Sequence, residues 1–121
     1  MRIVNRLYAF LGWAIVALGG LHMLTTIRLS STPAFRVWFF GSGIAMALVG
    51  ALNLLQRAYG PAAPGLRVVC RIANVFLTLF AAVAGALTRA SLVEYLVILG
   101  LLGGASILSF VPASYPKSAD A

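Results

Sequence analysis

Few residues of this 121-residue chain could do chemistry, and those few lie far apart in the sequence. There is one histidine, His22, one cysteine, Cys70, and two acidic residues, Glu94 and Asp120. A catalytic nucleophile needs a base beside it, and no Ser-His-acid or Cys-His set occurs at one depth of the expected helices. The sequence also contains no metal-ligand cluster and no phosphate-binding glycine loop. We therefore predict that the protein is not an enzyme.

The strongest candidate for ligand binding is His22. An ionisable side chain inside an apolar segment is costly, so it is by default a functional hypothesis. His22 lies six residues before Arg28, about 9 Å from that helix end at 1.5 Å per residue. With Thr26, Trp38 and Ser42 it forms the predicted site for a lipid, a quinone or haem. The alternative is a packing role, with the imidazole hydrogen-bonded to Thr26 or Ser42 and Trp38 in an interfacial aromatic belt.

Haem is the most demanding of these ligands. Transmembrane haem proteins usually hold the iron between two histidines on facing helices. One histidine in the chain allows this only in a symmetric dimer, or with Met23 or Met46 as the partner of His22. The cofactor is therefore left unassigned, and a metal at His22 is expected only if haem is bound.

Two asparagines form a second polar feature. Asn53 and Asn74 each lie about one helical turn inside an arginine, on segments that enter the apolar region from the same side. They should therefore lie at similar depth, where an amide pair would satisfy both side chains. Such a bond between helices in lipid contributes about 0.6 kcal/mol on average. We predict that Asn53 and Asn74 pair to stabilise helix packing.

The composition indicates a membrane environment. Hydrophobic residues make up 62% of the chain and charged residues 9%, compared with about 45–50% and about 25% in soluble domains. The net charge of +7 does not indicate nucleic-acid binding, because the nine basic residues stand singly between apolar stretches rather than on one face. In those positions they can anchor helix ends and contact anionic lipid headgroups.

The charged residues and helix-breaking residues divide the chain into four apolar segments. We predict transmembrane helices over about 7–27, 36–57, 67–88 and 92–111, followed by a short disordered tail over 112–121. Thr32 before Pro33 favours a helix start, and Ser91 with Glu94 matches a capping box. The short first and third connections predict two helical hairpins in an up-down four-helix bundle, as one all-α membrane domain.

The basic residues also indicate orientation. Six of them flank the side that holds both termini: Arg2, Arg6, Arg57, Arg67, Arg71 and Lys117. Three flank the other side: Arg28, Arg36 and Arg89. The positive-inside rule then predicts that both termini face the cytoplasm, in the cell's inner membrane.

Small and polar residues form a stripe on each predicted helix. The first stripe includes Gly12 and Gly19, and the fourth includes Gly100, Gly103 and Ile107. Such stripes allow close helix packing in lipid, and there are more of them than one bundle needs. We therefore expect an accessory or scaffold subunit that binds a membrane-protein partner or a second copy of itself. The alternatives are a binder of a small molecule near His22 and a small dimeric transporter.

Overall fold

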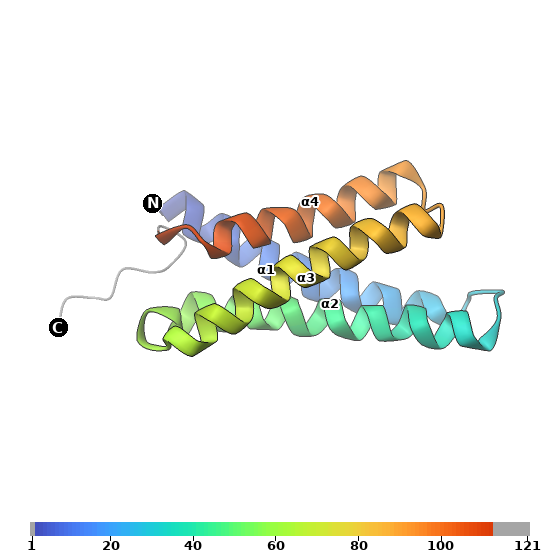
Figure 1. Cartoon of the computed structure of the whole chain (residues 1–121), viewed down its shortest axis with the longest axis horizontal. Helices are drawn as coiled ribbons and strands as arrows, with labels where there is room; N and C mark the ends of the chain where they lie inside the picture. The colour runs from blue at the N-terminus through green and yellow to red at the C-terminus, as the bar shows by residue number, and fades with distance from the viewer. Residues whose placement is uncertain (1, 113–121) are drawn as a thin grey trace.

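A computed structural model describes residues 2–112 as four long α-helices (Figure 1). The helices are α1 (Arg2–Thr26), α2 (Pro33–Tyr59), α3 (Pro64–Leu87) and α4 (Leu92–Ser109), with a 3-10 turn, η1 (Gly60–Ala62), between α2 and α3. Each α-helix is long and apolar enough to cross a membrane, and the described residues contain no strand. The all-helical class predicted from the sequence is confirmed. The tail predicted over 112–121 lies outside the described residues except for Pro112.

Local side-chain chemistry sets the helix ends. The Thr32 side chain accepts a hydrogen bond from the Phe35 backbone amide at 3.3 Å, with Pro33 at the first helical position. Before α4, Ser91 and Glu94 form the reciprocal capping box, as predicted. Each of these bonds satisfies an amide that the helix itself leaves unpaired.

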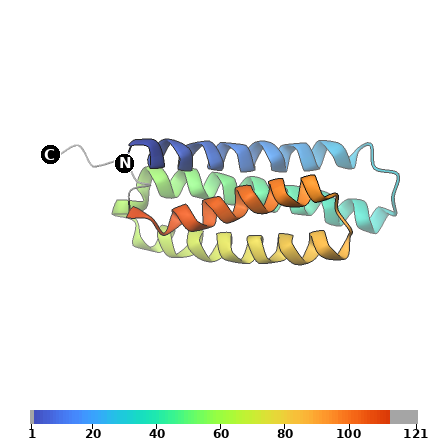
Figure 2. The same ribbon diagram turned by 90° about the horizontal axis from the view of Figure 1, so that it is seen from above.

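The helices lie side by side along the long axis of the molecule (Figure 2). The α1–α2 and α3–α4 connections lie at one end, and the α2–α3 connection lies at the other end, near the N-terminus. We call the first the far end and the second the N-terminal end. The most extensive helix contacts are within the pairs α1–α2 and α3–α4. The molecule is therefore two helical hairpins packed against each other.

Glycines bring α1 and α2 into backbone contact. A Cβ added to Gly19 would lie 2.6 Å from the Gly43 carbonyl oxygen, and one added to Gly50 would lie 2.8 Å from the Gly12 carbonyl oxygen. These distances leave no room for a methyl group against rigid backbone. The small-residue stripe predicted on the first helix is thus the contact surface of the first hairpin.

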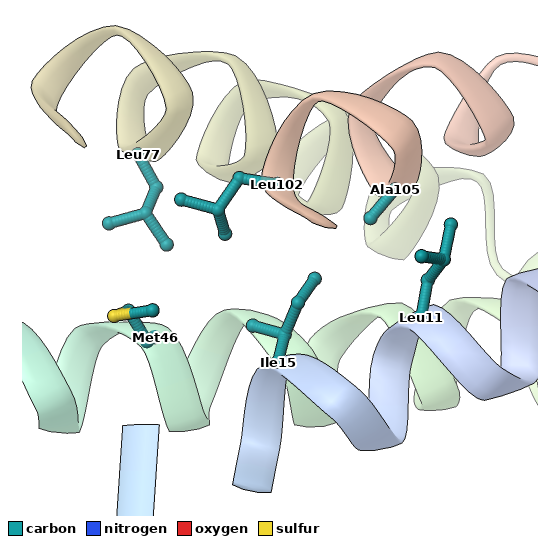
Figure 3. Close-up of a cluster of buried hydrophobic side chains, with 6 residues drawn as sticks. All are labelled: Leu11, Ile15, Met46, Leu77, Leu102 and Ala105. Carbon is teal, nitrogen blue, oxygen red and sulfur yellow. The ribbon is translucent and has the colours of Figure 1, made fainter. Parts of the chain in front are cut away.

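The hydrophobic core lies where the two hairpins meet. Side chains from all four helices converge there (Figure 3): Leu11, Ile15, Met46, Leu77, Leu102 and Ala105. Large apolar side chains also cover the outside of the bundle, for example Phe10, Trp13 and Phe76, each at least 65% exposed. Core packing therefore uses only part of the apolar surface of these helices.

The residues of the stripe predicted on the fourth helix do not pack against the other three helices. The buried residues of α4 are Leu102, Ala105 and Ser109, whereas Ile107 is 68% exposed. A Cβ on Gly100 or Gly103 would meet no atom within 4 Å. Because α4 is apolar on all sides, Gly100 and Gly103 did not mark its inner face. Its rotation is fixed instead by contacts with the other helices.

Candidate functional site

A buried polar cluster links α1, α2 and α3 in the N-terminal half of the bundle. Asn53 and Asn74 donate to each other, Nδ2 to Oδ1, at 2.9 Å in both directions. The Tyr8 hydroxyl donates to the same Asn53 Oδ1 at 2.7 Å, and the Cys70 thiol lies 3.6 Å from it. All four side chains are at most 1% exposed. Their mutual hydrogen bonds offset the cost of burying polar groups.

A second set of contacts joins the hairpins beyond this cluster. The Ser109 carbonyl at the end of α4 accepts from Gln56 Nε2 at 2.9 Å and from Arg71 Nε at 3.0 Å. The Arg71 guanidinium also lies 4.9 Å from the centre of the Phe110 ring. These interactions satisfy the C-terminal carbonyl of α4 and hold the helix against α2 and α3.

A cavity of about 330 Å³ occupies the opposite half of the bundle, toward the far end. All four helices line it: α1 by Leu18 to Thr25, α2 by Phe35 to Met46, α3 by Leu77 to Gly85 and α4 by Val93 to Leu102. Most of the lining is apolar. A void of this size with few polar groups has the character of a small-molecule site.

Aromatic rings form one wall of this cavity. The His22 imidazole stacks on Phe39, with ring centres 4.6 Å apart and an interplanar angle of 17°. Phe35 continues the row at 6.0 Å from Phe39, and Trp38 lies 5.6 Å from Phe80 of α3. Stacked and tilted rings at these distances attract one another. The histidine is thus held as part of an aromatic surface.

The structure brings together three of the four residues predicted for the ligand site. His22, Trp38 and Ser42 line the cavity, whereas Thr26 does not. Thr26 is 8% exposed, and its hydroxyl donates to the His22 backbone carbonyl at 3.0 Å. Thr26 therefore belongs to the end of α1 rather than to the cavity.

The hydrogen bonds of the His22 imidazole also differ from those expected for a packing role. Its Nδ1 lies 3.2 Å from the Leu18 carbonyl oxygen, four residues earlier in the same helix. The Ser42 hydroxyl donates to the Phe39 carbonyl. The backbone of each helix therefore supplies the partner, and no bond joins the His22 imidazole to the hydroxyl of Thr26 or Ser42.

Several cavity residues were not predicted from the sequence. They lie on α3, on α4 or in the turn between them: Phe80, Thr88, Glu94 and Tyr95. Glu94 was interpreted only as a capping residue, and a position in the cavity does not prevent that role. Tyr8, missing from the predicted polar pair, lies one helical turn before Gly12 on the stripe of the first helix, so that stripe could have revealed it.

The described residues contain no group of three His, Cys, Asp or Glu side chains that could hold a metal ion. Met46 lines the cavity together with His22, whereas Met23 lies close to Gly43 in the α1–α2 contact. Comparison of the chain with protein-family models, curated proteins and solved structures finds no match.

Proposed function

We propose that this chain is a four-pass membrane protein that binds a lipid-soluble small molecule in the cavity beside His22. The apolar outer surface supports membrane insertion, because side chains such as Trp13, Leu24 and Phe76 are more than 60% exposed. Water solvates such a surface poorly, whereas lipid tails match it. The four helices then form an up-down bundle.

The cavity is the observation that carries the binding proposal. Its volume of about 330 Å³ lies in the range of roughly 300–1,000 Å³ typical of ligand pockets. It opens among apolar and aromatic side chains, with His22, Ser42 and Glu94 as polar groups that could orient a ligand. His22 bonds to a backbone carbonyl rather than to a nucleophile. We therefore propose binding rather than catalysis.

One substitution and a matched control test this function. Ala84 lines the cavity, whereas Ala86 lies two residues further along α3 and is exposed. Ala84→Phe should fill the cavity, and Ala86→Phe should leave it open. Native mass spectrometry of protein released from membranes should show a bound small molecule on the wild type and on Ala86→Phe, and none on Ala84→Phe. Identical spectra for the three proteins would overturn the proposal.

The proposed topology places both termini in the cytoplasm. Five arginines flank the N-terminal end of the described helices: Arg2, Arg6, Arg57, Arg67 and Arg71. Single thiols at Ser30 and Ser118, in a Cys70→Ser background, test the orientation. An impermeant thiol reagent outside intact cells should label position 30 and leave position 118 unlabelled. Labelling of position 118 but not of position 30 would show that the topology is the reverse of the one proposed.

An accessory role in a larger membrane assembly is the second candidate function. The observation that favours it is the open surface beside Gly100 and Gly103, where an added Cβ would meet no atom within 4 Å. A partner helix could approach the α4 backbone closely there. A protein that co-purifies in mild detergent and is lost on Gly103→Leu would support this role. Its retention on Gly103→Leu would count against this surface.

A further inference from the structure

The hydroxyl groups that line the cavity already donate their hydrogens within the protein. Each one donates to a backbone carbonyl on its own helix or on the helix packed against it, at 2.6 to 3.0 Å. The four pairs are Thr25 with Leu21, Ser42 with Phe39, Thr88 with Ala84, and Tyr95 with Ala82. A hydroxyl has one hydrogen but can still accept through its lone pairs. These side chains therefore present acceptors to the cavity.

In its neutral form the imidazole of His22 presents an acceptor as well. A backbone carbonyl can only accept, so the contact between Nδ1 and the Leu18 carbonyl oxygen at 3.2 Å places the hydrogen on Nδ1. Neutral imidazole carries one N–H, which leaves a lone pair on Nε2. The ring itself is fixed by stacking on Phe39. A ligand group facing Nε2 must therefore supply the hydrogen.

The charged groups point to the same ligand chemistry. Glu94, a carboxylate that only accepts, lines the cavity, and among residues 2–112 no lysine or arginine does. Its Oε2 is bonded to the Ser91 hydroxyl at 2.8 Å. Trp38 contributes an indole N–H to the lining, but its side chain is 43% exposed and its ring packs against Phe80. Acceptors thus outnumber donors among the lining side chains.

We infer that the cavity selects a ligand that carries a hydrogen-bond donor, a hydroxyl or an ammonium group, on an aromatic apolar body. This inference rests on the proposed function. The rings from His22 to Phe35 are stacked on one another, so a ligand ring beside this row can pack against their edges, an arrangement that aromatic rings favour. A carbonyl or carboxylate in the same place would set acceptor against acceptor, which costs the desolvation of both groups.

Four naphthalene probes that differ in one substituent test this selectivity. 2-Naphthol is a neutral donor, 2-methoxynaphthalene has the same ring without the donor, 2-naphthoate is an anion, and 2-naphthylmethylamine is protonated at neutral pH. Each is titrated by calorimetry into lipid nanodiscs that hold the wild type, His22→Phe or Ala84→Phe. Subtracting the Ala84→Phe signal removes partition of the probe into lipid. His22→Phe retains a ring beside Phe39 but lacks Nε2.

We expect wild-type protein to bind 2-naphthol about tenfold more tightly than 2-methoxynaphthalene, as one hydrogen bond allows. His22→Phe should bring the two affinities within about twofold by weakening only 2-naphthol. The naphthol and ammonium probes identify which donor is preferred, and tighter binding of either one than of the methoxy probe supports the inference. If His22→Phe does not fold, the wild-type ratio still decides the question.

Three results would overturn the inference, and they distinguish its failure from that of the proposed function. If neither 2-naphthol nor 2-naphthylmethylamine binds more tightly than 2-methoxynaphthalene, and Ala84→Phe abolishes the binding of all three, donor selectivity is refuted and the proposed binding function is left intact. The same holds if 2-naphthoate binds most tightly. No difference between the wild type and Ala84→Phe for any probe would refute the cavity as a binding site, and the inference with it.

Discussion

Replacing Asn53 or Asn74 by leucine should destabilise the bundle unequally. Leucine has nearly the shape of asparagine, so the change removes hydrogen bonds with little change in volume. Asn74→Leu removes the two bonds that join the asparagines. Asn53→Leu removes these two and also the acceptor of the Tyr8 hydroxyl. We therefore expect Asn53→Leu to be the more costly change.

The hydrogen-bond count sets the magnitude of each effect. At about 0.6 kcal/mol for each interhelical bond, Asn74→Leu should cost about 1.2 kcal/mol and Asn53→Leu about 1.8 kcal/mol. Apart from the weaker contacts of the Cys70 thiol, the double substitution removes the same three interhelical bonds as Asn53→Leu alone, and it leaves no asparagine with a lost partner. Its cost should not exceed that of Asn53→Leu, which gives a coupling free energy of about 1.2 kcal/mol. Tyr8→Phe, which removes the bond to Asn53, should cost at least about 0.6 kcal/mol.

Reversible unfolding in mixed detergent micelles, followed by circular dichroism, measures these free energies. The double-mutant cycle reports the coupling directly. If the free-energy cost of the double substitution equals the sum of the costs of Asn53→Leu and Asn74→Leu, the two side chains contribute independently to stability. Equal costs for the two single variants would show that the bond from Tyr8 contributes nothing to stability.

Three further predictions concern packing and helix ends, measured by the same unfolding assay. Gly19→Ala should destabilise the bundle by about 1–3 kcal/mol, because the added Cβ would press on the α2 backbone. Gly20→Ala, whose Cβ meets no atom within 4 Å, should be neutral or stabilising. Equal changes in stability for the two variants would refute the close contact at Gly19. Arg89 has φ = 52°, a left-handed conformation that favours glycine. Arg89→Gly should therefore stabilise the protein by about 1 kcal/mol, whereas Arg89→Ala should not. Equal stabilities of the two variants would show that the backbone at Arg89 is not strained. Ser91→Ala should cost about 0.5–2 kcal/mol through loss of the α4 cap, and an unchanged stability would show that the cap is dispensable.

Much of the fold could be predicted from single residues whose side chains favour one local structure. A hydroxyl before proline at Thr32 and the pair Ser91 and Glu94 specify helix starts in any environment. The depth of Asn53 and Asn74 followed from their distance to flanking arginines, because helix rise per residue is constant. These inferences needed no knowledge of which helices are neighbours.

The rotation of α4 and the far wall of the cavity could not be predicted in this way. A helix that is apolar all round has no sequence period to mark its inner face. The inner face of α4 is set by contacts that only the assembled bundle provides, such as the Tyr95 hydroxyl on the Ala82 carbonyl and Gln56 on the Ser109 carbonyl. The position of Glu94 in the cavity follows from that rotation. Thr26 was misplaced because sharing a stripe with His22 does not place a residue in the same cavity.

The polar cluster and the cavity lie in opposite halves of the bundle. In the N-terminal half, hydrogen bonds from Tyr8 through Asn53 to Asn74 join the hairpins directly. In the far half, the hairpins surround a cavity walled by rings, and His22 and the hydroxyls that line it bond to backbone carbonyls rather than to each other. Filling or emptying that cavity breaks none of the bonds in the polar cluster. We therefore expect Ala84→Phe to abolish ligand binding in a bundle that retains the coupling between Asn53 and Asn74, and loss of that coupling in Ala84→Phe would show that the two halves are not independent.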